Sequence, residues 1–254
     1  MKELLERMIY DYVNDFAKES RISWREPIIG YARADDPLFG KLKEVVTPAH
    51  SLPQDILEEA NTVIAYFLPF TKDVMESNLD GRHSSKIWGV AYVETNRLIN
   101  EISRYLAEAL ISRGYKAASI PTTRNFDPET MTSDWSYRSA AYIAGLGTFG
   151  LNHMLITESG CCGRVGSLVT DLVIEPTLRY ESELCLHKVN GSCARCVAKC
   201  VNNSLQENEL DKQRCYKMLQ ENADRLKDLQ GPPQVCGKCM VGVPCATAIP
   251  QTKK

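Results

Sequence analysis

The sequence predicts a mixed fold of α/β or α+β type, with a first domain of residues 1–180 and a second, cysteine-rich domain of residues 181–254. Three observations support this interpretation. Residues 62–68 form a continuous apolar and β-branched run before Pro69, which indicates a buried strand. Residues 85–113 repeat apolar side chains at helical spacing, and residues 116–120 then predict a second strand, which completes a strand–helix–strand unit. The remaining third of the chain holds most of the cysteines.

The other elements follow from periodicity and turn residues. Residues 1–20 predict an amphipathic helix, whereas residues 26–55 are rich in Pro, Gly and Asp and predict long connections with one short helix. Residues 71–83 are polar and predict an excursion from the core. In the long helix, Ser85 is the expected N-cap and Gly114 the expected end.

The second half of the first domain is expected to contain one helix and two strands. Ser133 or Asp134 is the predicted cap of a helix that ends at Gly145. Two strands are then predicted, over residues 154–157 and 165–174.

Composition narrows the class of protein. The chain has 254 residues, 44% of them hydrophobic, which is ordinary for a globular protein. A net charge of −2 argues against a general nucleic-acid-binding surface. The charged start shows no signal peptide, and no apolar run is long enough for a membrane span. We therefore expect a protein of the reducing cytoplasm, where cysteines bind metals more often than they form disulfides.

Eight of the ten cysteines lie between residues 185 and 245, in two tight runs. The runs approximate a repeated C-x2-C-x2-C-x3-C-P pattern, in which the fourth cysteine of each run binds the other of two iron–sulfur clusters. Asn190 stands where the first cysteine of a regular run would be, and Cys185 precedes it. The crossing rule assigns the eight cysteines to two sets. Set one is Cys185, Cys193, Cys196 and Cys245, and set two is Cys200, Cys215, Cys236 and Cys239.

Three kinds of site remain open for these cysteines. Two [4Fe-4S] clusters fit the total of eight and the C-x3-C spacing, and we favour them. Two four-thiolate zinc sites fit the C-x2-C pairs almost as well. Disulfides fit the even number but require an oxidising compartment.

A glycine-rich segment, Gly145-Leu-Gly147-Thr-Phe-Gly150, matches the dinucleotide-binding pattern G-x-G-x-x-G. We reject that function because the pattern must follow a strand, whereas the preceding residues predict a helix. Two interpretations remain open: a backbone surface on which a planar cofactor lies, or a plain turn between a helix and a strand.

Several other residues carry less specific signals. Cys161 and Cys162 are predicted to be free thiols in an exposed turn, with ligation or redox contact with a cofactor as the alternative. Lys238 and Arg195 are expected to be solvated surface charges, although they lie inside the cysteine runs and could raise a cluster potential. The four histidines lack metal-binding spacing. They are His50, His83, His153 and His187.

The string from Ala140 to Asn152, followed by the segments 155–157 and 170–171 and by the two cysteine runs, resembles the epoxyqueuosine reductase and reductive dehalogenase family. The resemblance implies a nitroreductase-like domain that binds cobalamin, fused to a ferredoxin-like domain with two [4Fe-4S] clusters. Thr148 and Leu151 stand where tRNA-modifying members usually carry Trp and Lys, and the chain stops at Lys254. tRNA is therefore a doubtful substrate.

The function implied by the resemblance is an iron–sulfur oxidoreductase that passes electrons through the clusters to cobalamin and reduces a small or nucleoside-type substrate. Its electron donor would be a ferredoxin- or flavodoxin-type protein. Asp134 is a weak candidate for a catalytic acid. The alternative is a ferredoxin-like electron carrier, or a reductive activator of a partner protein, with no substrate of its own. The expected cofactor face consists of Ala144, Gly145, Leu146, Gly147, Gly150 and Asn152.

Overall fold

The computed structural model describes residues 1–122 and 126–251. Its centre is a four-stranded sheet in the order β1 (Ile28–Arg33), β2 (Thr62–Pro69), β6 (Gly163–Thr170) and β3 (Ala117–Ser119). Every pair of neighbours is antiparallel. The sheet is therefore of α+β type. The predicted strand–helix–strand unit exists, but β6 lies between its two strands, so β2 and β3 do not pair with each other.

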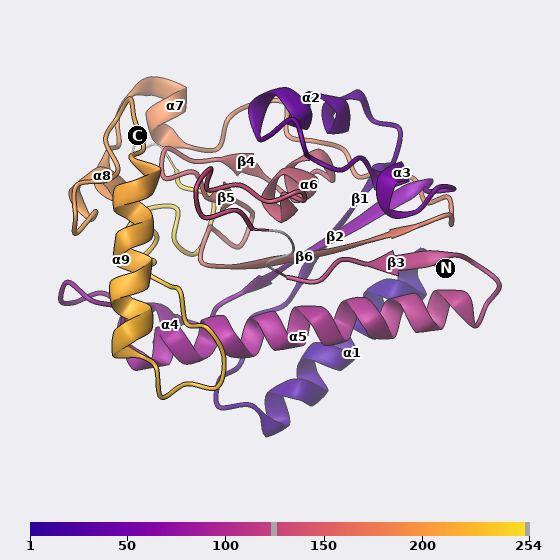
Figure 1. Cartoon of the computed structure of the whole chain (residues 1–254), viewed down its shortest axis with the longest axis horizontal. Coiled ribbons are helices and arrows are strands. Elements are labelled where there is room, and N and C mark those ends of the chain that lie inside the picture. Colours follow the sequence, from indigo (N-terminus) through magenta and orange to yellow (C-terminus); the bar gives the residue numbers. More distant parts are fainter. Residues whose placement is uncertain (123–125, 252–254) are drawn as a thin grey trace.

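Helices cover both faces of the sheet (Figure 1). On one face lie α1 (Lys2–Glu19) and the long α5 (Lys86–Ile111), which pack against each other. On the other face lie α2 (Pro37–Val45), the short α3 (Pro53–Ile56) and α6 (Tyr137–Ile143). The strand β2 is buried along its whole length because both of its faces are covered, which explains why its sequence is apolar throughout rather than alternating.

The boundaries of α5 confirm the prediction from the sequence. The Ser85 hydroxyl accepts a hydrogen bond from the Trp88 N–H, as an N-cap does. The left-handed residue after the helix is Gly114, with φ of 86°. By contrast, the predicted cap of α6 is wrong: neither Ser133 nor Asp134 caps it, because the Ser136 hydroxyl accepts from Ser139 N–H.

Two segments contain more regular structure than the sequence predicts. Residues 26–55 include the strand β1 and the helices α2 and α3, and residues 71–83 include α4 (Lys72–Ser77). The predicted strand at 154–157 shortens to β5 (Leu155–Ile156), which pairs with β4 (Thr148–Phe149) in a separate two-stranded sheet.

The cysteine-rich segment contains α7 (Leu186–Asn190), α8 (Arg195–Ala198) and α9 (Lys212–Arg225). The helix α9 stands beside the start of α5, where Gly89 allows close approach: a Cβ there would lie 2.7 Å from Leu226 Cδ1. One hydrophobic cluster runs across the predicted domain boundary, from Ile9 and Leu98 to Cys196 and Val235. The division into two domains stays a prediction.

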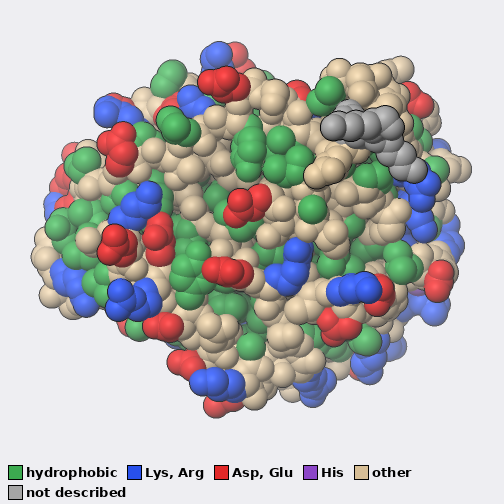
Figure 2. Space-filling view, turned by 180° about the vertical axis from the view of Figure 1, so that it is seen from behind, with side chains coloured by type: hydrophobic (Ala, Val, Ile, Leu, Met, Phe, Trp, Pro, Cys, Tyr) green, Lys and Arg blue, Asp and Glu red, His purple; other side chains and the backbone are tan. Residues whose placement is uncertain are grey.

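The surface of the described residues is mixed in charge. Acidic and basic side chains are interspersed over the face seen in Figure 2. Within residues 1–122 and 126–251, none of the helices has the length and apolarity that a membrane crossing requires.

Candidate functional site

The cysteines of set one converge from three separated parts of the chain. Cys185 directly precedes α7, Cys193 and Cys196 lie at α8, and Cys245 lies in the last described segment. All four line one narrow cavity of about 20 Å³. Burial raises the pKa of the Cys196 thiol to about 11, and the neighbouring thiols add to this effect. The Cys196 thiol is therefore costly to ionise without a nearby positive charge.

The cysteines of set two lie close enough to affect one another electrostatically. Cys215 projects from the first turn of α9, and burial together with Cys215 and Cys200 raises the pKa of Cys236 to about 11. Burial, and then the other three members of the set, also raise the pKa of Cys239.

Cys200 differs from the other members of set two. Burial would raise its pKa, but the Ser204 hydroxyl and backbone N–H groups outweigh burial and lower it. The Leu205 N–H donates to the Cys200 Sγ over 3.3 Å. Such donors stabilise a ligating thiolate and influence the potential of a cluster that it holds.

The arrangement of the sulfur atoms bears on the kind of metal. All ten cysteines lie in the described residues and none is in a disulfide. Within the described chain, no group of three or more His, Cys, Asp or Glu side chains is placed to hold one metal ion. A four-thiolate zinc site needs sulfur atoms about 3.8 Å apart, from Zn–S bonds of about 2.3 Å. In a cubane each thiolate binds a different iron.

The glycine segment packs against its own chain. A Cβ at Gly147 would lie 2.0 Å from the Ile156 carbonyl oxygen, and one at Gly145, which has a φ of 78°, would lie 2.8 Å from the Leu178 carbonyl oxygen. Internal packing therefore explains these glycines. The segment follows the helix α6, which agrees with the rejection of a dinucleotide site.

All six residues of the predicted cofactor face are buried. Gly150 and Asn152 nevertheless line the same cavity as the cysteines of set one. The other four are enclosed by the chain and do not fit a corrinoid in this conformation. The binding role of all six stays a prediction. One of them has a different contact: the Asn152 Nδ2 donates to the Cys239 carbonyl oxygen over 3.1 Å. It thereby attaches the loop before β5 to the second cysteine run.

Cys161 and Cys162 do not lie in an exposed turn, which corrects the prediction. Both are buried, at 2% and 0% exposure, directly before β6. The Cys161 N–H donates to the Cys245 carbonyl oxygen over 2.8 Å, and the two side chains are also hydrogen-bonded. The free thiols are thus packed against set one.

Lys238 also corrects the prediction, because it is only 2% exposed. Its Nζ donates to the carbonyl oxygens of Asn78 over 2.9 Å and Asp80 over 2.7 Å, and burial lowers its pKa. A buried ammonium group thus lies between Cys236 and Cys239 in sequence. Arg195, by contrast, is exposed as expected.

Asp134 lies in the loop before α6, where its backbone carbonyl accepts from the Ser51 N–H over 2.8 Å. Its charge acts on His50, a buried histidine whose pKa is lowered mainly by burial. The structure therefore brings Asp134 near His50, and its catalytic role stays a prediction.

The sequence analysis missed two arginines next to set two. Arg138 lies in the first turn of α6 with its side chain exposed, and desolvation by the surrounding chain lowers its pKa. Arg164 lowers that pKa further, whereas the thiols Cys239 and Cys215 raise it. A cation in the first turn of a helix opposes the helix dipole, and this was the available signal in the sequence.

Comparison with known proteins gives a likeness of fold. No family model matches the chain, and no curated protein matches it either. Among solved structures, an epoxyqueuosine reductase in complex with a tRNA-Tyr stem loop is 21% identical with a TM-score of 0.61, over 95% of this chain and 66% of that one. The epoxyqueuosine reductase of Bacillus subtilis is 19% identical with a TM-score of 0.60, over 97% and 67%.

A reductive dehalogenase described with a B12-dependent mechanism is 18% identical with a TM-score of 0.59, over 88% of this chain and 30% of that one. The chain thus spans about two thirds of the length of the epoxyqueuosine reductases that it matches, and less than a third of this dehalogenase. At this identity the comparison establishes the fold, and it confirms the resemblance predicted from the sequence at that level. The chain has the fold shared by the epoxyqueuosine reductases and the reductive dehalogenases.

Proposed function

We propose that this chain is an iron–sulfur oxidoreductase whose two cysteine sets each hold a [4Fe-4S] cluster. The observation that carries the proposal is the lining of one cavity by Cys185, Cys193, Cys196 and Cys245, which come from distant parts of the chain. The electrostatic coupling of Cys239 to the other cysteines of set two supports it as well. The fold, shared with reductases, is consistent with the same function.

In this mechanism the clusters, when bound, take up and release single electrons. The chain supplies eight thiolates that hold the irons and an apolar enclosure that excludes water. The donors around Cys200 stabilise its thiolate, and the buried ammonium of Lys238 makes electron uptake at set two more favourable. A separate donor protein of ferredoxin or flavodoxin type would deliver the electrons.

The final electron acceptor belongs to the proposal too. The likeness to a B12-dependent dehalogenase makes cobalamin the leading cofactor, with a small molecule as the substrate. The glycine segment is buried, so a corrinoid would need another face or an opened conformation.

The burial of the glycine segment favours a second function. If no corrinoid binds, the chain would transfer electrons to a partner protein, as a ferredoxin-like carrier or a reductive activator. The buried state of Gly145, Gly147 and Gly150 is the observation in its favour, because a carrier needs no enclosed substrate pocket.

Anaerobic purification with metal, sulfide and corrinoid analysis tests both functions. We expect a brown protein with about eight irons per chain, because each cubane holds four. Cys196→Ser and Cys215→Ser, one from each set, should each lose about half of the iron. The matched control is Cys162→Ser, a buried cysteine outside both sets, which should keep it. A colourless protein, or one that binds zinc, would refute the redox function, and iron without corrinoid binding would select the carrier.

A further inference from the structure

Two segments that are far apart in the sequence are fixed against each other beside set one. The Cys161 N–H donates to the Cys245 carbonyl oxygen over 2.8 Å, and the next amide, that of Cys162, donates to the Ala246 carbonyl oxygen over 3.2 Å. These two consecutive backbone bonds fix the position of Cys161 relative to Cys245, which is a member of set one.

Two further residues reinforce this pairing of segments. The guanidinium group of Arg25 donates to the Ser159 carbonyl oxygen over 2.5 Å and to the Thr247 carbonyl oxygen over 3.1 Å, so one side chain bonds both segments. Gly160 permits their close approach, because a Cβ there would lie 2.5 Å from the Ala246 carbonyl oxygen. The position of Cys161 therefore depends on several residues and not on one contact.

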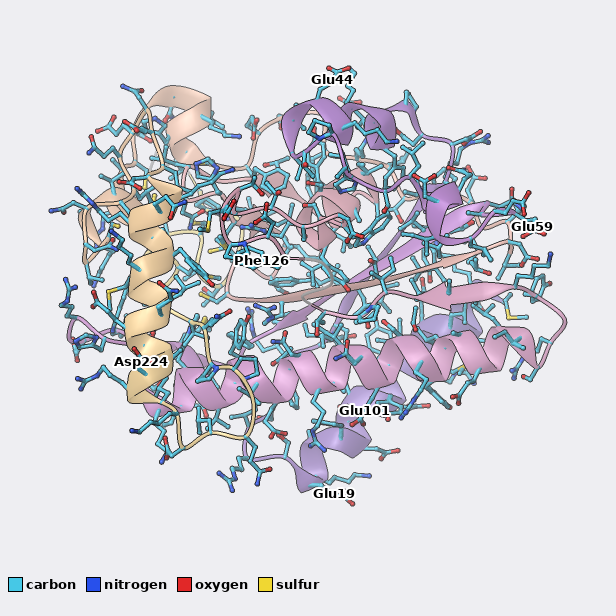
Figure 3. All side chains as sticks on the ribbon, viewed as in Figure 1. Glu19, Glu44, Glu59, Glu101, Phe126 and Asp224 are labelled. Atoms are coloured by element: carbon cyan, nitrogen blue, oxygen red, sulfur yellow. The ribbon has the colours of Figure 1, made fainter. Side chains whose placement is uncertain are left out.

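The side chain of Cys161 lies next to the cavity of set one. It is hydrogen-bonded to the side chain of Cys245, and it packs in one hydrophobic cluster with Cys185, a second member of the set. Its Sγ lies 4.0 Å from the Nδ2 of Asn152, and Asn152 lines the cavity itself. Sulfur atoms gather at this end of the molecule, beside α8 and α9 (Figure 3). A fifth thiol thus lies beside the four that line the cavity.

Cys162 differs from its neighbour, although both thiols are buried. The Cys162 Sγ donates to the Met240 carbonyl oxygen over 3.1 Å, whereas the Cys161 Sγ reaches the same oxygen only over 3.9 Å. Cys162 also packs in the main hydrophobic cluster, and Cys161 packs in the smaller one that contains Cys185. Cys161 is therefore the better placed of the two to replace a member of set one.

We propose that Cys161 is a reserve ligand of set one, which binds the iron of Cys245 whenever Cys245 is displaced. Cys161 would release its proton to solvent and form a sulfur–iron bond, while Cys245 would lose its own bond to iron and take up a proton. No electron is gained or lost in this exchange, so it needs no oxidant or reductant. The inference rests on the proposed function, because it requires a [4Fe-4S] cluster at set one.

Iron analysis of alanine variants tests the exchange, because alanine, unlike serine, has no side-chain atom that binds iron. Each variant is purified anaerobically as the full chain. Cys245→Ala should keep about eight irons, since Cys161 takes the vacant position, whereas the double variant Cys161→Ala/Cys245→Ala should lose about half of them. The matched control Cys162→Ala/Cys245→Ala removes the same number of thiols and should keep about eight.

The results separate this inference from the proposed function. Cys196→Ala, which removes another member of set one, should lose about half of the iron if set one holds a cluster. If Cys245→Ala also loses half, or if the two double variants hold equal amounts, Cys161 is not a reserve ligand and the proposed function stands. If the wild type holds no iron, the proposed function and this inference fail together.

A second measurement leaves Cys245 in place, so it does not depend on the folding of the Cys245 variants. A reserve ligand holds the cluster when the bond between Cys245 and iron opens transiently. Cys161→Ala should therefore release iron to an excess of a chelator at least threefold faster than the wild type, and Cys162→Ala should release it at the wild-type rate. Equal rates in all three proteins would contradict the proposal.

Discussion

Replacement of Asn222 by alanine should loosen α9 and with it the second cysteine set. Asn222 is 1% exposed and joins α9 to two other segments. Its Oδ1 accepts from the Ser84 N–H over 3.0 Å, and its Nδ2 donates to the Val235 carbonyl oxygen over 2.8 Å. Cys215 lies two turns earlier on the same face of the helix, so the orientation that Asn222 fixes is also the orientation of a proposed ligand.

The size of the effect follows from the two hydrogen bonds. The Asn222→Ala change leaves the Ser84 N–H unpaired, at about 1–3 kcal/mol. It also removes one bond to the Val235 carbonyl oxygen, at about 0.5–1.5 kcal/mol, because that oxygen still accepts from the Ser84 hydroxyl over 3.3 Å. The middle of the summed range is about 3 kcal/mol. Because 1.4 kcal/mol corresponds to a factor of ten, local opening of α9 should become about a hundredfold more frequent.

Amide hydrogen exchange on the anaerobically purified protein measures this local opening, and it does not require global unfolding to be reversible. The amides of α9 should exchange about a hundredfold faster in Asn222→Ala, whereas those of α1 should not change. The control Gln220→Ala removes an exposed polar side chain from the same helix and should change exchange less than about threefold. If α9 in Asn222→Ala exchanges within threefold of the wild type, the two hydrogen bonds do not hold the helix and the reasoning is wrong.

Three further changes test other parts of the structure. Lys238→Met removes a buried positive charge and should lower the midpoint potential of one cluster, which redox titration with EPR detection measures. The control Lys217→Met, which removes an exposed lysine, should leave that midpoint potential unchanged. Gly147→Ala places a Cβ 2.0 Å from a carbonyl oxygen and should lower the melting temperature by several degrees or abolish soluble expression, whereas Gly40→Ala, with open space around it, should do neither. Burial lowers the pKa of His50 below its usual 6.5, so its contribution to stability is full above pH 6.5 and is lost as pH falls from there through the lowered pKa. His50→Gln should remove that slope from denaturation curves between pH 7 and pH 5, and an unchanged slope would assign it to other groups.

Elements defined by a strong local pattern were predictable from the sequence. The apolar period of α5, its Ser85 cap and the glycine that follows it are all local signals, and the structure agrees with each. The strand β2 was predictable for the same reason, because burial on both faces makes its sequence continuously apolar.

Elements defined by distant contacts were not predictable. The strand β1 lies in a segment rich in turn residues, and its Gly30 is needed because the Ala144 carbonyl oxygen would lie 2.3 Å from a Cβ there. Three residues near the start of α6 can act as a helix cap: Ser133, Asp134 and Ser136. The cap is Ser136, next to the buried Trp135, whose Nε1 donates to the Ser167 Oγ over 3.0 Å.

The candidate site divides in the same way. The spacing of the cysteines predicts the two sets, and the assignment of ligands stays a prediction. In the structure the cysteines of set one line one cavity, and those of set two affect the pKa of Cys239. The burial of Lys238 was missed because its acceptors, Asn78 and Asp80, lie about 160 positions away in the sequence. The electrostatic effects of Arg164, Cys239 and Cys215 on Arg138 were missed for the same reason, because these residues lie far apart in the sequence.

The hydrophobic cluster that joins α5 to the cysteine-rich segment has a consequence for the lifetime of the protein. Cys196 and Val235 share that hydrophobic cluster with Ile9 and Leu98, so damage at the proposed iron–sulfur site of Cys196 would reach the interior of the whole molecule. A molecule stripped of iron by oxygen would expose apolar surface far from the damaged sulfur atoms. Proteases and chaperones would then clear it, so the cell would accumulate little inactive apoprotein, and the abundance of this protein should follow iron supply.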